Sequence, residues 1–257
     1  MSKAPSALPN NSQPQEALTA LTEGQQKLLD EYKERLINKG IDENDDVLSK
    51  EQEYFLIAFL RGRKWRLEKA VSSLLSYRVL EEKYGPFDYE HAKDILDKGT
   101  LTMVTNARDL QDRQLLFLNL GKNPKAGTEL DKGKYKIIVT MYHLNRAIKS
   151  LKTQQNGVSC IVDFKGFKYT LPNADMKEVL YACQEAVPLL FKQILIVDPP
   201  WFFNVIWAVI RKLLPTKLQK RITIVKQKNL SKYVDAENLP ISLGGKLSDE
   251  VDEIPEI

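Results

Sequence analysis

The chain has 257 residues, 43% of them apolar, and a formal net charge of +4 from 38 basic and 34 acidic side chains. This length and apolar content are typical of a globular protein with a sizeable core. The nearly balanced charge argues against a protein built to coat nucleic acid. The only two cysteines, Cys160 and Cys183, lack metal-ligand spacing, so the sequence predicts neither a disulfide framework nor a metal site.

The N-terminal part of the chain is predicted to be a short leader followed by helices. Residues 1–15 are rich in Pro, Ser, Asn and Gln and contain no apolar run, which indicates a disordered leader and a cytoplasmic protein. Apolar residues then recur at helical spacing over 16–39, about 50–60 and about 67–85. We therefore expect a helical N-terminal domain over residues 16–100.

The pattern changes in the second half of the chain to short apolar runs that predict buried strands. These runs cover residues 114–120, 158–164, 193–198 and 221–225. Helical faces lie between them: one at Ile137, Met141, Leu144, Ile148 and Leu151, and another at Met176, Val179, Cys183 and Val187. Alternating strands and helices predict an α/β domain with a largely parallel sheet over residues 101–247, followed by an acidic tail at 248–257.

Residues 201–214 form the most unusual stretch, because eleven of the fourteen are apolar and they cover every side of a helix. The stretch is shorter than the roughly 20 residues that a bilayer span needs. Basic residues follow at once: Arg211, Lys212, Lys217, Lys220 and Arg221. An apolar face beside a basic one is typical of helices that lie at a membrane surface. A buried core helix that ends in solvated charges is the alternative.

Enzymatic motifs are missing from the sequence. Its two histidines, His91 and His143, belong to no catalytic pattern, and there is no G-x-S-x-G elbow, phosphate-binding loop or G-x-G-x-x-G turn. The carboxylates Asp109, Asp163 and Asp198 fall at strand ends or turns, where a structural role is the common one. We therefore expect no catalytic residue.

Four motifs, in order, resemble the CRAL-TRIO family, which includes tocopherol, retinaldehyde and phosphatidylinositol transfer proteins. They are Phe59-LRGRKWRLEKA, Ile161-VDFKG, Pro200-WFFNVIW and Leu239-PISLGG, and the resemblance covers roughly residues 52–246. It implies a helical N-terminal domain, then a mixed, largely parallel sheet flanked by helices, with a lipid cavity closed by a gate helix.

The resemblance also implies the function. It implies an intracellular lipid-binding and transfer protein, not an enzyme, that encloses one phospholipid, phosphoinositide or tocopherol- or retinoid-like molecule. Such a protein needs no cofactor besides its lipid, acts as a monomer, and associates transiently with anionic or phosphoinositide-containing membranes. The alternative is a phosphoinositide-responsive regulatory or recruitment module that transfers no cargo.

Carried over by position, the resemblance predicts three groups of site residues. The cavity wall would consist of Ile137, Thr140, Met141, Leu144, Val158, Cys160, Val179, Ala182 and Ile194, with Phe203, Trp207 and Ile210 of the gate facing inward. The membrane side of the gate would be formed by Phe202, Ile206 and Val209. A basic cleft for lipid headgroups would contain Arg63, Lys192, Lys217 and Arg221. For Arg63, a structural salt bridge inside the helical domain is the alternative.

The chain departs from the family pattern in two places. Where phosphatidylinositol-transfer members have Y-P-E-R, this chain has Val187-Pro-Leu-Leu, so Leu189 stands in place of the glutamate that helps to hold the inositol headgroup. The usual K-P-F-L at the end of the gate is Arg211-Lys-Leu-Leu, which removes a proline and predicts a longer gate helix.

Overall fold

The computed structural model describes residues 20–96, 101–122, 132–167 and 174–249. The leader expected at 1–15 and most of the expected acidic tail lie outside these ranges. The N-terminal part consists of helices, as the apolar spacing predicts: α2 (Glu23–Asn38), the short 3-10 helix η1 (Asp46–Leu48), α3 (Glu53–Gly62), α4 (Leu67–Tyr84) and α5 (Tyr89–Leu96). A capping box at Thr22 and Gln25 starts α2. Helix α5 was not predicted.

The sheet has five strands in the order β1-β2-β3-β4-β5: β1 (Leu101–Arg108), β2 (Gln114–Asn119), β3 (Val158–Asp163), β4 (Phe191–Val197) and β5 (Ile222–Val225). β1 pairs antiparallel with β2, and the three other pairs are parallel. The predicted α/β fold with a largely parallel sheet is therefore confirmed. The edge strand β1 is the one that the sequence analysis missed.

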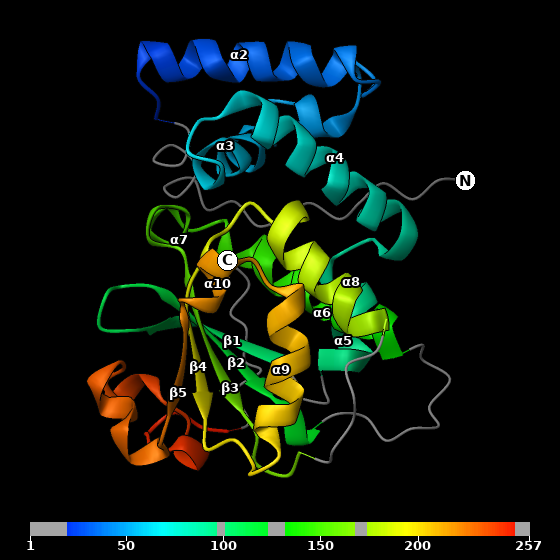
Figure 1. Cartoon of the computed structure of the whole chain (residues 1–257). Coiled ribbons are helices and arrows are strands. Elements are labelled where there is room, and N and C mark those ends of the chain that lie inside the picture. Colours follow the sequence, from blue (N-terminus) through cyan, green and yellow to red (C-terminus); the bar gives the residue numbers. More distant parts are fainter. Residues whose placement is uncertain (1–19, 97–100, 123–131, 168–173, 250–257) are drawn as a thin grey trace.

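Helices and irregular segments cover the two faces of the sheet (Figure 1). The helices of this half are α6 (Lys132–Ala147), α7 (Leu151–Asn156), α8 (Ala174–Tyr181) with its π-helical extension η3 (Ala182–Ala186), α9 (Phe203–Leu213) and α10 (Thr216–Gln219). The 3-10 helices are η2 (Leu120–Lys122), η4 (Gln227–Lys232), η5 (Ala236–Asn238) and η6 (Ile241–Leu243). Ile161 and Leu195 pack against the C-terminal segment at Leu230, whereas Val162 and Ile194 lie on the α9 side. The sheet thus separates a closed C-terminal face from a face that α9 covers.

The single helix expected through Ile137 and Leu151 is in fact two helices. α6 ends at Ala147, and Leu151 begins α7 after a short turn. The Ser150 hydroxyl accepts a hydrogen bond from the Thr153 backbone N–H at 3.4 Å, which is the geometry of an N-cap. A side chain that caps a new helix ends the preceding periodic pattern, and the apolar spacing alone did not reveal this.

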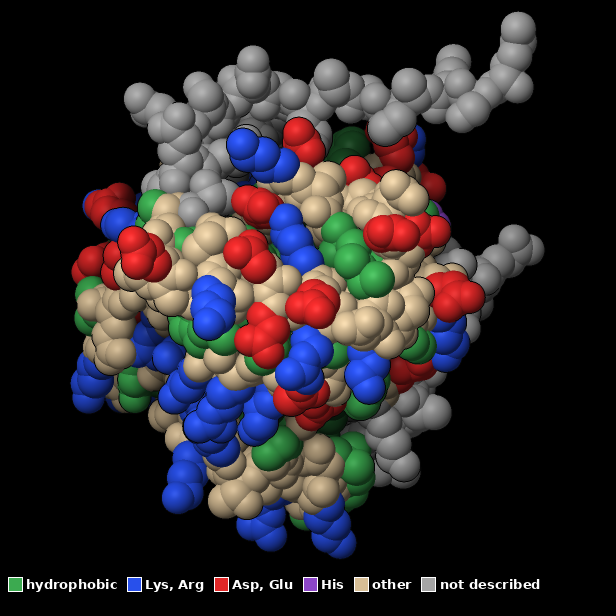
Figure 2. Space-filling model, turned by 90° about the horizontal axis from the view of Figure 1, so that it is seen from above, with side chains coloured by type: hydrophobic (Ala, Val, Ile, Leu, Met, Phe, Trp, Pro, Cys, Tyr) green, Lys and Arg blue, Asp and Glu red, His purple; other side chains and the backbone are tan. Residues whose placement is uncertain are grey.

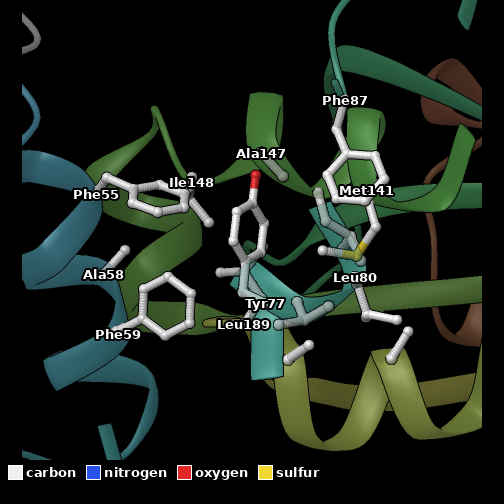
Figure 3. Close-up of a cluster of buried hydrophobic side chains, with 14 of the residues drawn as sticks. Phe55, Ala58, Phe59, Tyr77, Leu80, Phe87, Met141, Ala147, Ile148 and Leu189 are labelled. Carbon is white, nitrogen blue, oxygen red and sulfur yellow. The ribbon is translucent and has the colours of Figure 1, made fainter. Parts of the chain in front are cut away.

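The N-terminal helices and the α/β part share one hydrophobic cluster (Figure 3). Tyr77 of α4 lies at its centre, with ring centroids 5.1 Å from Phe55 and 5.8 Å from Phe87. The cluster continues through Met141 of α6 to Leu189, which precedes β4. Because apolar surface from both halves is buried together, each half stabilises the other.

His143 of α6 provides a pH-dependent contribution to stability. The side chain is completely buried, its Nε2 lies 2.9 Å from the Leu101 carbonyl oxygen, and burial lowers its pKa to about 4. A histidine with a folded-state pKa below the unfolded value of about 6.5 contributes stability above pH 6.5 that is lost as the pH falls toward 4.

We expect His143→Gln to remove part of this acid sensitivity. Glutamine can still donate to the Leu101 carbonyl but does not ionise, so stability should depend less on pH between about 6.5 and 4. Urea unfolding of both proteins at about pH 7 and about pH 4.5 measures the effect. Equal losses of stability in both proteins would show that His143 is not the responsible group.

Candidate lipid site and basic surface

Helix α9 has the position expected of the gate helix and runs along one face of the sheet (Figure 1). It begins after Pro199 and Pro200, where the Phe203 N–H donates to the Pro200 carbonyl at 2.9 Å. It ends at Leu213, because Leu214 is extended and Pro215 follows. A residue before proline avoids the helical conformation, so Pro215 stops the helix. Helix α9 thus continues through Lys212, where the family pattern has a proline, and the expected lengthening of the gate stays a prediction.

The inner side of α9 packs on the sheet through aromatic and aliphatic side chains. Phe203 stacks on Trp207 with centroids 6.2 Å apart and meets Phe164 edge-on at 5.2 Å. Ile206 is also on this side and is only 4% exposed. In this closed arrangement Ile206 faces the sheet and not the solvent, because residues 203, 206, 207 and 210 form one stripe at helical spacing.

The outer side of α9 and the residues just before it leave large apolar side chains in solvent. Trp201 is 90% exposed, Val205 55% and Val209 40%. We call these three residues the exposed apolar face. The basic residues Arg211 and Lys212 at the end of the helix are exposed too. The apolar residues that the sequence places on every side of this helix thus form two stripes on α9, one buried against the sheet and one exposed to solvent. Val209 lies outward as expected, Phe202 is half-buried, and Val205 was missed.

The residues expected to line a cavity divide into two groups. Partly exposed in the structure are Thr140, Val179, Ile194, Trp207 and Ile210. Almost completely buried are Ile137, Met141, Leu144, Val158 and Ala182, while Cys160 and Phe203 are buried. Met141 lies beside Phe87 in the shared cluster (Figure 3). A side chain without accessible surface borders no space that admits water, so the second group does not line an open cavity in this structure.

The sheet face beneath α9 is incompletely covered. Val162, Ile194 and Ile222 belong to three adjacent strands and contact the α9 cluster, yet all three remain partly exposed. The opposite face of the same strands is closed, with Ile161 and Leu195 completely buried. The α9 side of the sheet therefore retains accessible apolar surface, which is the kind of lining that an apolar ligand needs.

The two cysteines lie in β3 (Cys160) and in the π-helical segment η3 (Cys183). Burial raises the pKa of both thiols to about 12, and the charge of Cys183 contributes to the shift at Cys160. A thiol that stays protonated is a weak nucleophile. Neither thiol is therefore suited to act as a nucleophile near neutral pH. No group of three metal-ligating side chains occurs in residues 20–96, 101–122, 132–167 and 174–249.

Arg63 connects the helical part to the α/β part. Its Nε donates to the Ser73 hydroxyl at 2.9 Å, and Nη2 donates to the carbonyl oxygens of Gln184 and Glu185 at 3.0 and 2.8 Å. Burial lowers the pKa of Arg63, partly offset by the charge of Glu185. The structure therefore favours a structural role for Arg63 over a contact with a lipid headgroup. Its partners are two carbonyls and a hydroxyl, however, and not the carboxylate of a salt bridge.

We expect Arg63→Met to lower the free energy of unfolding by about 2 kcal/mol, because the substitution leaves the buried Ser73 hydroxyl and two partly covered carbonyls without their charged donor. Its exposed neighbour Lys64 supplies the control, since Lys64→Met should cost less than about 0.5 kcal/mol. Urea unfolding measures both. A stable Arg63→Met protein that had lost its affinity for anionic vesicles would instead favour the headgroup role.

Positive charge gathers around Lys192 at the start of β4. Burial lowers the pKa of Lys192, and the charges of Arg221, Lys64, Arg113 and Lys217 lower it further. We call these five residues the basic cluster. Among the described residues, neither Lys64, Lys192 nor Lys217 forms an ion pair, and Arg221 donates to the Phe191 carbonyl at 2.6 Å. Figure 2 shows a dense group of Lys and Arg side chains at lower left, beside a surface of mixed charge.

The basic cluster differs in part from the predicted basic cleft. Lys192, Lys217 and Arg221 are brought together as expected, but Arg63 is tied into the fold and Lys64 lies near Lys192 instead. Arg113 was missed. It precedes β2, as Lys192 begins β4, and the first residues of neighbouring parallel strands meet at one edge of a sheet. The position of Arg113 just before a predicted parallel strand was therefore the feature of the sequence that could have revealed it.

Curated relatives of the chain include proteins named for lipid transfer. Human alpha-tocopherol transfer protein-like is 26% identical over 175 residues, which are 65% of this chain and 50% of that protein. The phosphatidylinositol transfer protein CSR1 of Eremothecium gossypii is 26% identical over 208 residues, 74% of this chain and 46% of that protein. Human tyrosine-protein phosphatase non-receptor type 9 is 30% identical over 197 residues, 74% of this chain but only 32% of the phosphatase. The chain thus matches about a third to a half of these relatives.

A solved structure and a family profile agree with this picture. The crystal structure of Sfh5 has the same fold, with a TM-score of 0.58 at 16% identity over 89% of both chains. No helix in the described part of the chain is long and apolar enough to cross a bilayer. The profile of the CRAL/TRIO domain matches residues 98–245, more than half of the sequence. The chain is therefore a member of the CRAL/TRIO family.

Proposed function

We propose that this protein is a cytoplasmic lipid carrier that, as a monomer, encloses one hydrophobic molecule between the sheet and α9 and exchanges it at membranes. The observation that carries the proposal is the two-sided character of α9. Its inner side covers a sheet face whose apolar side chains remain partly exposed, and its outer side leaves Trp201, Val205 and Val209 in solvent. A helix with apolar side chains on both sides can contact a lipid inside and a bilayer outside.

The exchange cycle follows from where these side chains find apolar surroundings. In water, α9 stays on the sheet because Phe203, Ile206 and Trp207 would otherwise be exposed. At a bilayer, both sides of the helix can be buried in the interfacial region, so the free-energy cost of leaving the sheet falls. The membrane therefore favours the open arrangement, and no covalent step is required.

The basic cluster supports docking to an anionic surface. Each Lys or Arg near such a surface contributes about 1 kcal/mol, and the effect is screened by salt. Lys217 and Lys64 are exposed, and Arg211 and Lys212 extend the positive surface to the end of α9. We infer that the protein docks through the exposed apolar face and these charges together.

The cargo is one apolar lipid with a headgroup that needs no buried carboxylate. Leu189 stands where the inositol-lipid carriers have their glutamate, and it is buried in the shared cluster beside Tyr77 (Figure 3). Two relatives are named for different kinds of lipid: one is an alpha-tocopherol transfer protein-like protein and the other a phosphatidylinositol transfer protein. The apolar environment of Leu189 favours the first kind of cargo over the second.

Native mass spectrometry of the protein purified from eukaryotic cells tests the proposal. We expect one stoichiometric lipid per chain. Ile194→Trp should reduce this occupancy severalfold, because the larger ring fills space on the α9 side of the sheet. Ile241→Trp, at a 61% exposed position of η6, is the matched control and should keep the lipid. A wild-type protein that carries no lipid and takes none up from vesicles would refute the proposal.

A second candidate function is a lipid-responsive recruitment module. It is favoured by the 30% identity to a region that makes up only 32% of a tyrosine phosphatase. A module of this kind would bind the same membranes but would not carry lipid from donor to acceptor vesicles. Binding measured in parallel with transfer separates the two functions.

A further inference from the structure

Strand β5 forms one edge of the sheet, at the left in Figure 1, and is paired on one side only. The Arg221 and Val225 carbonyl oxygens accept hydrogen bonds from the β4 side at 2.9 and 3.1 Å. Backbone groups alternate in direction along a strand, so the N–H and C=O groups of Ile222 and Ile224 point away from the sheet. No strand in the described part of the chain pairs with them. Such an edge is a template for one more strand.

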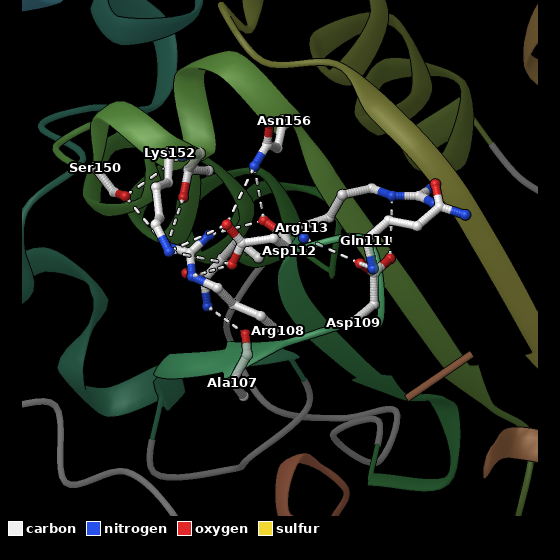
Figure 4. A network of polar contacts seen from close by, with 11 residues as sticks. Ala107, Arg108, Asp109, Gln111, Asp112, Arg113, Ser150, Lys152 and Asn156 are labelled. Carbon is white, nitrogen blue, oxygen red and sulfur yellow. Dashed lines mark hydrogen bonds and ion pairs between the residues drawn. The ribbon is translucent and has the colours of Figure 1, made fainter. Parts of the chain in front are cut away.

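The opposite edge strand, β1, is attached to its surroundings by polar contacts. Arg108 at its end donates to the Ser150 hydroxyl of α7 at 3.2 Å, and in the turn that follows Asp112 pairs with Lys152 at 3.1 Å (Figure 4). On β5, in contrast, the apolar side chain of Ile224 is 54% exposed. An exposed apolar side chain beside unpaired backbone groups is the combination that an added strand covers.

The chain returns to β5 shortly before its last residues. Asp249 accepts hydrogen bonds from the Ser242 N–H at 3.0 and 3.1 Å and from the Ser242 hydroxyl at 2.6 Å. The Ser242 carbonyl accepts from Gln227 Nε2 at 3.2 Å, and Gln227 is the second residue after β5. Residue 249 is therefore held close to the carboxyl end of β5. We call residues 250–257 the terminal segment, and it begins where an antiparallel neighbour of β5 would begin.

The terminal segment is long enough to follow the whole strand. An extended chain rises about 3.3 Å per residue, so its eight residues span about 26 Å, against about 13 Å for the four residues of β5. The remaining length reaches Lys220 and Lys217, which precede β5. Pro255 is compatible with this position, because a proline without an N–H is tolerated in an outermost strand and prevents a further strand from adding.

The charges of the two partners are complementary. The terminal segment has no basic residue and four acidic ones: Glu250, Asp252, Glu253 and Glu256. The residues on either side of β5 are basic: Lys217, Lys220, Arg221, Lys226 and Lys228. Among the described residues, Lys217, Lys220 and Lys228 are exposed and form no ion pair. A second copy of β5, paired antiparallel, would instead place Arg221 opposite Lys226, and like charges on opposite strands repel.

We propose that the terminal segment adds to the free edge of β5 as an antiparallel strand, and that an anionic membrane displaces it when the protein docks. Main-chain hydrogen bonds to Ile222 and Ile224 hold the segment, and pairs of acidic with basic side chains set its direction. In water the segment covers Lys217 and Lys220, and its release uncovers them. The release step rests on the proposed function, since it regulates docking beside α9.

Hydrogen exchange of single amides, measured by NMR on the full chain, tests the pairing. The Ile222 and Ile224 N–H groups should exchange at least about tenfold more slowly than in a chain that ends at Asp249, because the added strand bonds them. The Thr223 N–H faces β4 and is the internal control, with equal rates in both proteins. Equal rates at Ile222 and Ile224 as well would overturn the proposal. Slowing that grows with protein concentration would also overturn it and assign the edge to a second copy.

Two substitutions at Ile224 test the same contact without shortening the chain. Ile224→Glu adds a negative charge opposite the acidic segment and should speed exchange at Ile222 by about as much as the truncation. Ile224→Lys, the matched control, should keep the exchange slow. Both proteins should fold, because the side chain is more than half exposed. The same exchange rate in the two variants would contradict the pairing.

Vesicles test the release step. Hydrogen exchange of β5, followed by mass spectrometry, should rise in the full chain bound to phosphatidylserine vesicles to the level of the equally bound chain that ends at Asp249. Phosphatidylcholine vesicles should leave the exchange slow. A bound full chain that still exchanges more slowly than the truncated one would show that the membrane does not displace the segment. Lipid transfer by the truncated chain, which lacks the segment, tests the carrier function separately.

Discussion

Replacing Phe59 with alanine is expected to lower the free energy of unfolding by about 4 kcal/mol, within the range for deleting a fully buried phenyl ring. Phe59 lies in α3 and is completely buried. Its ring meets Phe55 edge-on at 5.1 Å and Tyr77 at 6.0 Å, inside the cluster shared with the α/β part. The cavity left behind would weaken the contact between both halves of the fold.

Urea unfolding followed by circular dichroism measures the loss. Tyr89→Ala in α5 is the control, because this aromatic residue is 54% exposed and its removal should cost about 1 kcal/mol or less. Since one cluster joins the halves, we expect a single unfolding transition in both proteins. A Phe59→Ala protein whose helices unfold alone, with the sheet at wild-type stability, would show that the shared cluster does not couple them.

The double substitution Val205→Asp and Val209→Asp is expected to slow lipid transfer between vesicles about 100-fold. Burying a valine side chain in an apolar environment contributes about 2 kcal/mol, and aspartate at these positions also opposes docking to an anionic surface. Both residues belong to the exposed apolar face of α9, so folding should be almost unaffected. The measurement is the initial rate of fluorescent lipid transfer at equal protein concentration.

A matched control changes equally exposed apolar residues away from α9. Val79 of α4 is 63% exposed and Ile241 of η6 is 61% exposed, so Val79→Asp with Ile241→Asp adds the same two charges. This protein should transfer lipid at nearly the wild-type rate. If the α9 variant were as fast as this control, α9 would not be the surface that meets the membrane.

The sequence predicts strands β2 to β4 because each contains a run of apolar residues, as expected of parallel strands covered by other layers. The edge strand β5 is only partly buried, and its short apolar run still reveals it. The edge strand β1 contains Thr102, Thr105 and Asn106 and pairs on one side only. Its mixed polarity hides it from a search for apolar runs. The turn that separates α6 from α7 depends on the cap at Ser150, which periodicity does not report.

The gate segment shows which properties of a helix its residue types predict and which they do not. An apolar segment beside basic residues was recognised, but the sequence alone did not fix how the helix is rotated on the sheet. The spacing of Phe203, Ile206, Trp207 and Ile210 would have placed Ile206 inside. Similarly, the resemblance brought Arg63 into the headgroup cleft, whereas its carbonyl partners come from a π-helical turn that no local pattern predicts.

The most direct test of the carrier account is the rate at which the purified wild-type protein moves a fluorescent lipid from donor to acceptor vesicles. The account predicts a rate that rises in proportion to protein concentration, far above spontaneous exchange, and that is faster when the acceptor vesicles are anionic. A rate no greater than that in buffer, from protein that binds the same vesicles, would contradict lipid transfer and leave the recruitment module as the function.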